Sequence, residues 1–161
     1  MKWSTQALGA LGWFTITFAA AALGAWASTS AASFYATLAL PAWAPPASLF
    51  GPVWTLLYAM MAVAAWLVWR ERGTAATRPA LTLYLLQLGV NALWSWLFFG
   101  WRLGALALVD ILLLVMLVVA TLIAFARIRA LAAVMLLPYL GWITFASTLN
   151  LAVWRANPGV L

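Results

Sequence analysis

Indole rings are the most abundant groups in this sequence that could do chemistry. Twelve of the 161 residues are Trp, and Trp54 and Trp142 stand inside apolar segments rather than at their ends. An indole offers a large flat apolar face and one N–H donor, which suits planar aromatic ligands. These residue types therefore favour a binding site for a flat hydrophobic molecule.

The groups that serve conventional catalysis are scarce. The chain has no Cys and no His, and its only carboxylates are Glu71 and Asp110. A Ser-His-Asp relay, a Cys nucleophile, a catalytic carboxylate pair and a metal-activated water each lack at least one required partner. We therefore expect no metal site and no required cofactor, and any haem would bind without the usual axial ligands.

The two carboxylates differ in their surroundings. Glu71 lies between Arg70 and Arg72 and is interpreted as a solvated surface residue. Asp110 lies within an apolar segment, where a charge costs about 3 kcal/mol unless it faces the protein interior or water. Two roles stay open for Asp110, namely a structural hydrogen bond and the binding of a ligand or ion.

Membrane helices are the elements that must position these residues. Hydrophobic residues make up 68% of the chain and charged residues 6%, far from the balance of soluble domains. Since open sheet edges are not tolerated in hydrocarbon, the spans should be helices. The prediction is an all-α integral membrane protein, a single domain over 1–161 with five spans at about 7–27, 51–69, 79–99, 103–126 and 131–154.

The first apolar segment has a second interpretation. Lys2, the apolar stretch and the triplet Ala25-Trp26-Ala27 would also suit a cleavable signal peptide. The stretch is long for a signal peptide and contains bulky Trp13 and Phe14, which favours a transmembrane span.

Charge predicts the orientation of the five spans. With five spans, six basic residues fall on the N-terminal side and only Arg102 and Arg155 on the other. The positive-inside rule then places the N-terminus in the cytoplasm and the C-terminus outside. A bacterial inner membrane is favoured over an outer membrane. The scattered basic residues indicate contact with the lipid bilayer and no nucleic acid partner.

Three predicted helices carry mixed aromatic and amide faces. At 100° per residue, each face gathers its residues on one side of its helix. They are Trp54 and Tyr58 on the second span; Gln87, Asn91, Trp94, Ser95 and Phe98 on the third; and Tyr139, Trp142, Ala146 and Asn150 on the fifth. Such faces should point inward, where they either line a pocket or hold helices together.

The long connection over 28–50 has no charged residue. It contains Tyr35 and Trp43, and Pro41, Pro45 and Pro46 restrict its backbone. We expect this loop to fold over the end of the bundle as a lid, with a plain connector as the alternative.

Several motifs occur together in one order along the chain. They are Tyr35-Ala-Thr-Leu-Ala-Leu-Pro41-Ala-Trp43-Ala-Pro45-Pro46, Pro52-Val-Trp54-Thr-Leu-Leu-Tyr58, Gln87-Leu-Gly-Val-Asn91-Ala-Leu-Trp94-Ser95, Pro138-Tyr139-Leu-Gly-Trp142, Leu149-Asn150 and Trp154-Arg155. In these motifs the sequence resembles the tryptophan-rich sensory protein and translocator protein (TspO/MBR) family, also called the peripheral benzodiazepine receptor family.

The resemblance implies a five-helix bundle, commonly a homodimer, with a pocket beneath the first loop for porphyrins such as protoporphyrin IX, for haem and for aromatic drugs. The family's pocket positions correspond to Tyr35, Trp54, Tyr58, Asn91, Trp94, Trp142 and Ala146. The residue faces and the loop add Trp43, Tyr139 and Asn150 as candidate ligand contacts. Porphyrin carboxylates are expected to meet Arg102, Arg155 or backbone N–H groups of the lid.

Three functions follow from this resemblance. The leading one is porphyrin binding with a sensory, regulatory or transport role in tetrapyrrole metabolism and stress. The alternatives are light- and oxygen-dependent porphyrin degradation, with Trp54 and Trp142 as its catalytic residues, and export of small solutes or drugs. The segment from Leu149 to Arg155 lacks the Tyr of the family's proposed sterol motif, so sterol binding is not expected.

Overall fold

The computed structural model describes residues 3–161, and Lys2, one of the six basic residues above, lies outside them. This part of the chain is helical and contains no strand. The elements are α1 (Trp3–Ala27), α2 (Ala31–Thr37), η1 (Ala47–Leu49), α3 (Phe50–Arg70), α4 (Thr77–Ser95), η2 (Trp96–Gly100), α5 (Gly104–Ala126) and α6 (Ala130–Ala156).

Five of these segments are long and apolar enough to cross a membrane, which confirms the predicted fold class. They run over 3–27, 47–70, 77–100, 104–126 and 130–156, close to the spans expected from the sequence. Two features were not expected. The first loop contains the short helix α2, and the third span ends in the π-helical turn η2.

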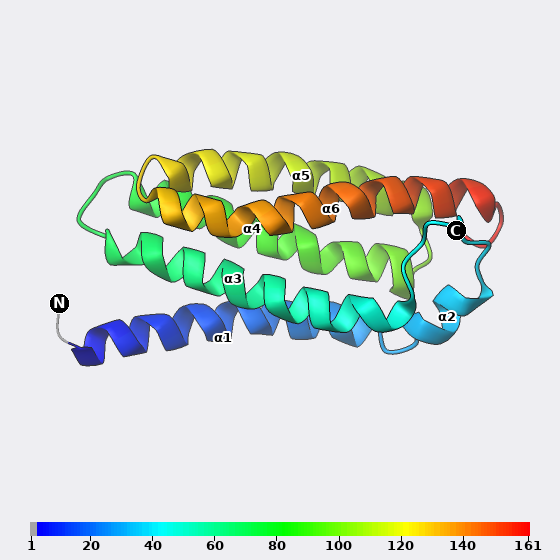
Figure 1. Ribbon diagram of the computed structural model, residues 1–161, viewed down its shortest axis with the longest axis horizontal. Helices are drawn as coiled ribbons and strands as arrows, with labels where there is room; N and C mark the ends of the chain where they lie inside the picture. Colours follow the sequence, from blue (N-terminus) through cyan, green and yellow to red (C-terminus); the bar gives the residue numbers. More distant parts are fainter. Residues whose placement is uncertain (1–2) are drawn as a thin grey trace.

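The two ends of the bundle differ (Figure 1). At one end lie the start of α1 and the α3–α4 and α5–α6 connections; we call this the N-terminal end. At the other end lie α2, the segment from 38 to 49, the short connection before α5 and the C-terminal residues; we call this the lid end.

Helix α1 packs on α3 and α4 as part of the bundle. The Trp66 indole donates to the Gln6 carbonyl at 3.2 Å, and the hydroxyls of Thr17 and Tyr84 lie 2.7 Å apart. A Cβ built on Gly9 would lie 2.1 Å from a ring carbon of Trp69, so this glycine allows the indole to pack directly on the helix backbone.

The half of the bundle nearer the N-terminal end is tightly packed. On α3, side chains from 61 to 68 face the neighbouring helices, and five of them are 0% exposed: Met61, Ala62, Ala64, Ala65 and Val68. Small side chains let helices approach closely, which is how membrane helices gain packing energy. We call this region the packed half.

Candidate functional site

A cavity of about 540 Å³ lies in the half of the bundle nearer the lid end. Residues of α1, α2, η1, α3, α4, η2 and α6 form its wall, whereas α5 contributes none. Seven of the ten predicted ligand contacts line it: Tyr35, Trp54, Tyr58, Asn91, Trp94, Trp142 and Ala146. The size is that of an ordinary small-molecule site.

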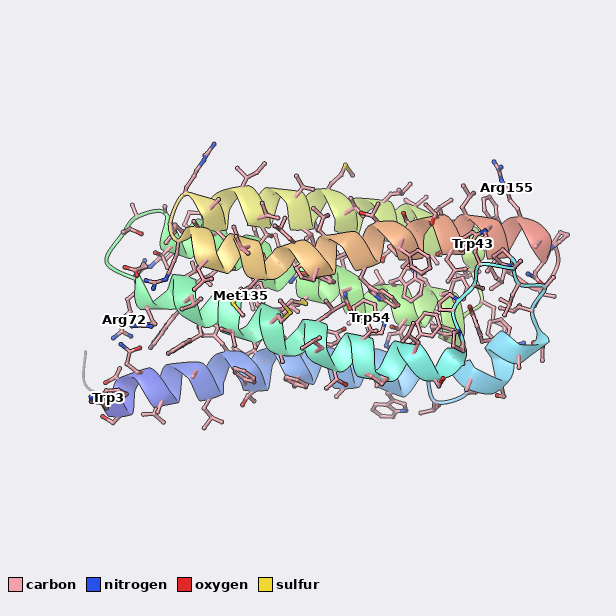
Figure 2. All side chains as sticks on the ribbon, viewed as in Figure 1. Trp3, Trp43, Trp54, Arg72, Met135 and Arg155 are labelled. Carbon is pink, nitrogen blue, oxygen red and sulfur yellow. The ribbon has the colours of Figure 1, made fainter. Side chains whose placement is uncertain are left out.

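The two predicted central indoles meet in the cavity wall. The Trp54 and Trp142 rings come from α3 and α6, with centroids 6.5 Å apart and planes at 88°. Figure 2 shows Trp54 pointing from α3 into the bundle. Trp142 Nε1 is buried and has no hydrogen-bond partner among the described residues. Because an unpaired buried donor is costly, a ligand acceptor that the indole turned to meet would stabilise it.

A chain of buried hydrogen bonds supports the polar part of the wall. The Tyr58 hydroxyl donates to Asn91 Oδ1 at 2.5 Å, and Asn91 Nδ2 donates to the Tyr139 hydroxyl at 2.7 Å. The Tyr139 hydroxyl in turn donates to Gln87 Oε1 at 2.9 Å. Tyr139 and Gln87 therefore lie behind the wall and fix the Asn91 amide from there.

Asn150 likewise supports the wall from behind. It accepts a hydrogen bond from Trp94 Nε1 at 3.1 Å, and its own Nδ2 donates to the Gly104 carbonyl at 3.1 Å.

Trp43 is 51% exposed on the lid and packs edge-on against Phe145, with ring centroids 5.8 Å apart. Tyr139, Asn150 and Trp43 are thus the three predicted ligand contacts that do not line the cavity.

The lid closes the end of the cavity through α2 and η1. Ala31, Ala32 and Tyr35 of α2 belong to the wall. The Tyr35 hydroxyl donates to the Pro45 carbonyl at 3.2 Å, and burial raises the pKa of Tyr35, so the hydroxyl keeps its proton. The Asn157 amide holds the lid backbone at Ala39, accepting from its N–H at 2.8 Å and donating to its carbonyl at 3.1 Å.

Among residues 3–161, no charged side chain belongs to the cavity wall. Arg102 lines a separate hollow, and Arg155 points away from the bundle at the lid end (Figure 2). Asp110 is 7% exposed on α5, and its Oδ2 has no hydrogen-bond partner within residues 3–161. The arginines expected to meet ligand carboxylates and the one carboxylate within a span therefore lie outside the wall.

The described residues also hold no group of three or more His, Cys, Asp or Glu side chains that could bind a metal ion. A metal-containing ligand would therefore find no cluster of ordinary protein ligands for its metal.

The sequence interpretation missed the contribution of α1. Five of its residues line the cavity, as does Ser28 directly after its end: Phe18, Ala21, Ala22, Gly24, Ala25 and Ser28. The signal was present, because small residues recur every four positions from Ala20 to Ser28, and this spacing is usually taken to indicate close helix packing. Phe50 and Phe99 were also not predicted as wall residues, whereas Ser95 lies on the inward face expected for the third span and does line the cavity.

Five apolar helices, four of which line an uncharged, aromatic cavity, define the class: an integral membrane protein with an internal pocket of ligand size. The chain belongs to the TspO/MBR family, whose sequence model matches residues 13–155.

Relatives of this family come from bacteria, archaea and animals. The chain is 44% identical to the human translocator protein over 128 residues, covering 78% of this chain and 76% of that protein. It is 41% identical to the tryptophan-rich protein TspO of Chlorobaculum tepidum over 129 residues, covering 78% and 80%. It is 38% identical to the tryptophan-rich sensory protein of Cereibacter sphaeroides over 141 residues, covering 85% and 87%.

Proposed function

We propose that the protein binds flat hydrophobic ligands of the porphyrin class, such as protoporphyrin IX or haem, in the cavity beneath the lid. The observation that carries this proposal is the pair of perpendicular indoles, Trp54 and Trp142, in an otherwise apolar wall. Trp54 offers a ring face for stacking, and the Trp142 N–H, which is buried without a partner, becomes a donor to a ring substituent when the indole turns towards the cavity.

The uncharged wall determines how such a ligand would lie. A carboxylate buried there would have no cation beside it, and burying an unpaired charge is strongly unfavourable. The macrocycle would therefore occupy the aromatic part of the cavity, and its carboxylates would project out of the cavity towards water.

The names of the relatives, translocator protein and sensory protein, support a role in sensing or moving such a ligand. We place the N-terminus in the cytoplasm, in a bacterial inner membrane. This orientation is based on the five arginines at the N-terminal end against two at the lid end, Arg102 and Arg155. We also propose that the protein acts as a homodimer.

Titration of the purified full chain with protoporphyrin IX, followed by tryptophan fluorescence quenching, tests the binding proposal. Trp54→Phe and Trp142→Phe should each weaken binding about tenfold, since each removes ring area and an N–H donor worth roughly 1 to 1.5 kcal/mol. Trp3→Phe is the control, because Trp3 is 92% exposed at the other end of the bundle. Equal losses in all three variants, or no loss in any, would contradict the assignment.

Light-dependent porphyrin degradation is a second candidate, and the same two indoles favour it. An electron-rich indole beside an excited porphyrin is placed to give it an electron, with dioxygen as the final oxidant. Loss of porphyrin absorbance under light in air should then require Trp54 and Trp142. Retained binding with lost photochemistry in the two variants would support this activity, whereas unchanged photochemistry would exclude a role for the indoles.

Export of small solutes has less support from the geometry. Proton coupling would need a titratable group, and Asp110 is the only carboxylate within a span. It belongs to α5, which contributes nothing to the cavity wall. Efflux that survives Asp110→Asn would exclude the simplest proton-coupled exporter.

A further inference from the structure

A second hollow, of about 310 Å³, lies on the other side of α2 from the cavity. Its wall consists of Ser30, Ser33, Phe34, Thr37, Arg102 and Val160. The cavity wall uses different residues of the same helix, Ala31, Ala32 and Tyr35. Helix α2 therefore separates an apolar chamber from a hollow lined by three hydroxyls and one guanidinium.

Arg102 is held over this hollow by a strained backbone. It is the only described non-glycine residue with positive φ, at 56°, in the short connection between η2 and α5. For a residue with a Cβ, the left-handed conformation costs about 1 to 2 kcal/mol. Strain of this kind is retained where the surrounding structure over-determines it, commonly at functional sites. Here it places the guanidinium 4.7 Å from the centre of the Phe34 ring.

The Arg102 guanidinium has no carboxylate partner in the described part of the chain. Within residues 3–161 the one ion pair joins Arg129 to Glu71 at the opposite end of the bundle. The guanidinium lies over the Phe34 ring and makes no hydrogen bond through its side-chain nitrogens to another described residue, so its N–H donors are available to a ligand.

The hydroxyls beside Arg102 add at least one further donor. Ser33 Oγ donates to the Ser30 carbonyl at 2.9 Å and Thr37 Oγ1 to the Phe34 carbonyl at 2.7 Å, so these two are already used. The Ser30 hydroxyl makes no hydrogen bond to another described residue. The hollow therefore offers hydrogen-bond donors from a guanidinium and a hydroxyl, and the residues of its wall include no negatively charged side chain to accept from them.

We propose that this hollow binds a phosphate-bearing anion, held by the Arg102 guanidinium and the Ser30 hydroxyl. Arg is the residue that best matches phosphate geometry, with two parallel N–H donors. Exposed Trp101, next to Arg102 at the start of a membrane span, marks the depth at which lipid head groups lie. A lipid head group and free phosphate are two sources of the same chemistry, and either would tie α2 to the start of α5.

The test uses the full chain in a maltoside detergent, which carries no phosphate, with ¹⁵N-labelled arginine. The side-chain Nε–H signals are followed by NMR during titration with inorganic phosphate and, separately, with dihexanoyl phosphatidylglycerol. The Arg102 signal, assigned from Arg102→Lys, should shift and saturate with at least one of them. Arg155, the other arginine at the lid end, is the matched control and should show only a small unsaturated drift.

Two variants separate binding from folding. Arg102→Gly removes the guanidinium and also suits the positive φ, so the chain should fold at least as well while binding, read from broadening of the ligand's ³¹P signal, is lost. Ser30→Ala should weaken binding about 3- to 10-fold, as expected for one hydrogen bond.

Saturation by inorganic phosphate would identify a free anion as the source, and saturation by the lipid alone would identify a head group; both support the proposal. Equal, unsaturated shifts at Arg102 and Arg155 would mean general surface attraction. That result, or full binding by Arg102→Gly, would overturn the proposal.

Discussion

The packed half and the cavity half are built by the same helices from different side chains. On α3, the residues from 61 to 68 that face the bundle include three alanines with no exposed surface. One to two turns earlier, the same helix presents Trp54 and Tyr58. Alanines let neighbouring backbones approach, whereas large aromatic rings hold them apart and leave space between them.

Helix α1 shows that small residues do not have one structural meaning. Gly9 receives the Trp69 ring directly and leaves no space. Ala21, Ala22 and Ala25 face the aromatic residues of the cavity half and instead become part of its wall. The side chains on the neighbouring helix therefore decide whether a small residue allows close packing or lines a cavity.

The largest expected contrast comes from the same substitution in the two halves. Ala65→Leu adds three carbon atoms where there is no free volume, and overpacking should lower the free energy of unfolding by about 3 kcal/mol. Ala21→Leu places the same atoms in the cavity and should leave stability within about 1 kcal/mol while weakening protoporphyrin IX binding at least about tenfold.

Thermal unfolding in detergent and porphyrin titration measure these two effects. If Ala21→Leu destabilised the protein as much as Ala65→Leu, the cavity would not be an open space, and the distinction between the halves would be wrong.

The hydrogen-bonded chain at the boundary of the halves should have the next largest effect. Tyr139→Phe leaves Asn91 Nδ2 without its acceptor and Gln87 Oε1 without its donor, at a cost of about 1 to 3 kcal/mol in unfolding free energy. Tyr35→Phe is the control, because it removes only one 3.2 Å bond in the lid. A smaller loss in Tyr139→Phe than in Tyr35→Phe, measured by thermal unfolding, would refute this ranking.

Asn150→Ala tests whether a residue behind the wall acts on the ligand through Trp94. Loss of the acceptor for Trp94 Nε1 should weaken porphyrin binding about 3- to 10-fold, since the indole is no longer fixed in the wall. In a double-mutant cycle with Trp94→Phe, the two effects should not add. Additive losses in porphyrin titration would indicate that Asn150 acts on the ligand by another route.

The smallest effect is expected for the ion pair at the N-terminal end. The Arg129 and Glu71 side chains lie 3.0 Å apart and are 39% and 40% exposed, so Glu71→Gln should cost less than about 1 kcal/mol. The loss should shrink further in high salt. Porphyrin affinity should not change, because none of the described residues at this end lines the cavity. A changed affinity would mean that the two halves are coupled.

Much of the architecture could be predicted from the sequence. Five apolar segments are long enough to cross a membrane. Their backbone N–H and C=O groups must form hydrogen bonds within helices, because hydrocarbon offers no other partners. The 100° spacing of side chains also placed Trp54, Asn91 and Trp142 on inward faces, and all three line one cavity.

The tertiary structure alone decided which residues of an inward helix face line the cavity. Tyr139 and Trp142 share one face of α6, yet only Trp142 lines the cavity, since α4 approaches Tyr139 closely enough to exchange hydrogen bonds with it. The spacing of a helix specifies a direction and not the distance to the next helix. The same reason applies to α1, whose small residues suit close packing and a cavity wall equally well. The position of Arg102 over Phe34 follows from a backbone turn that no pattern of side chains predicts.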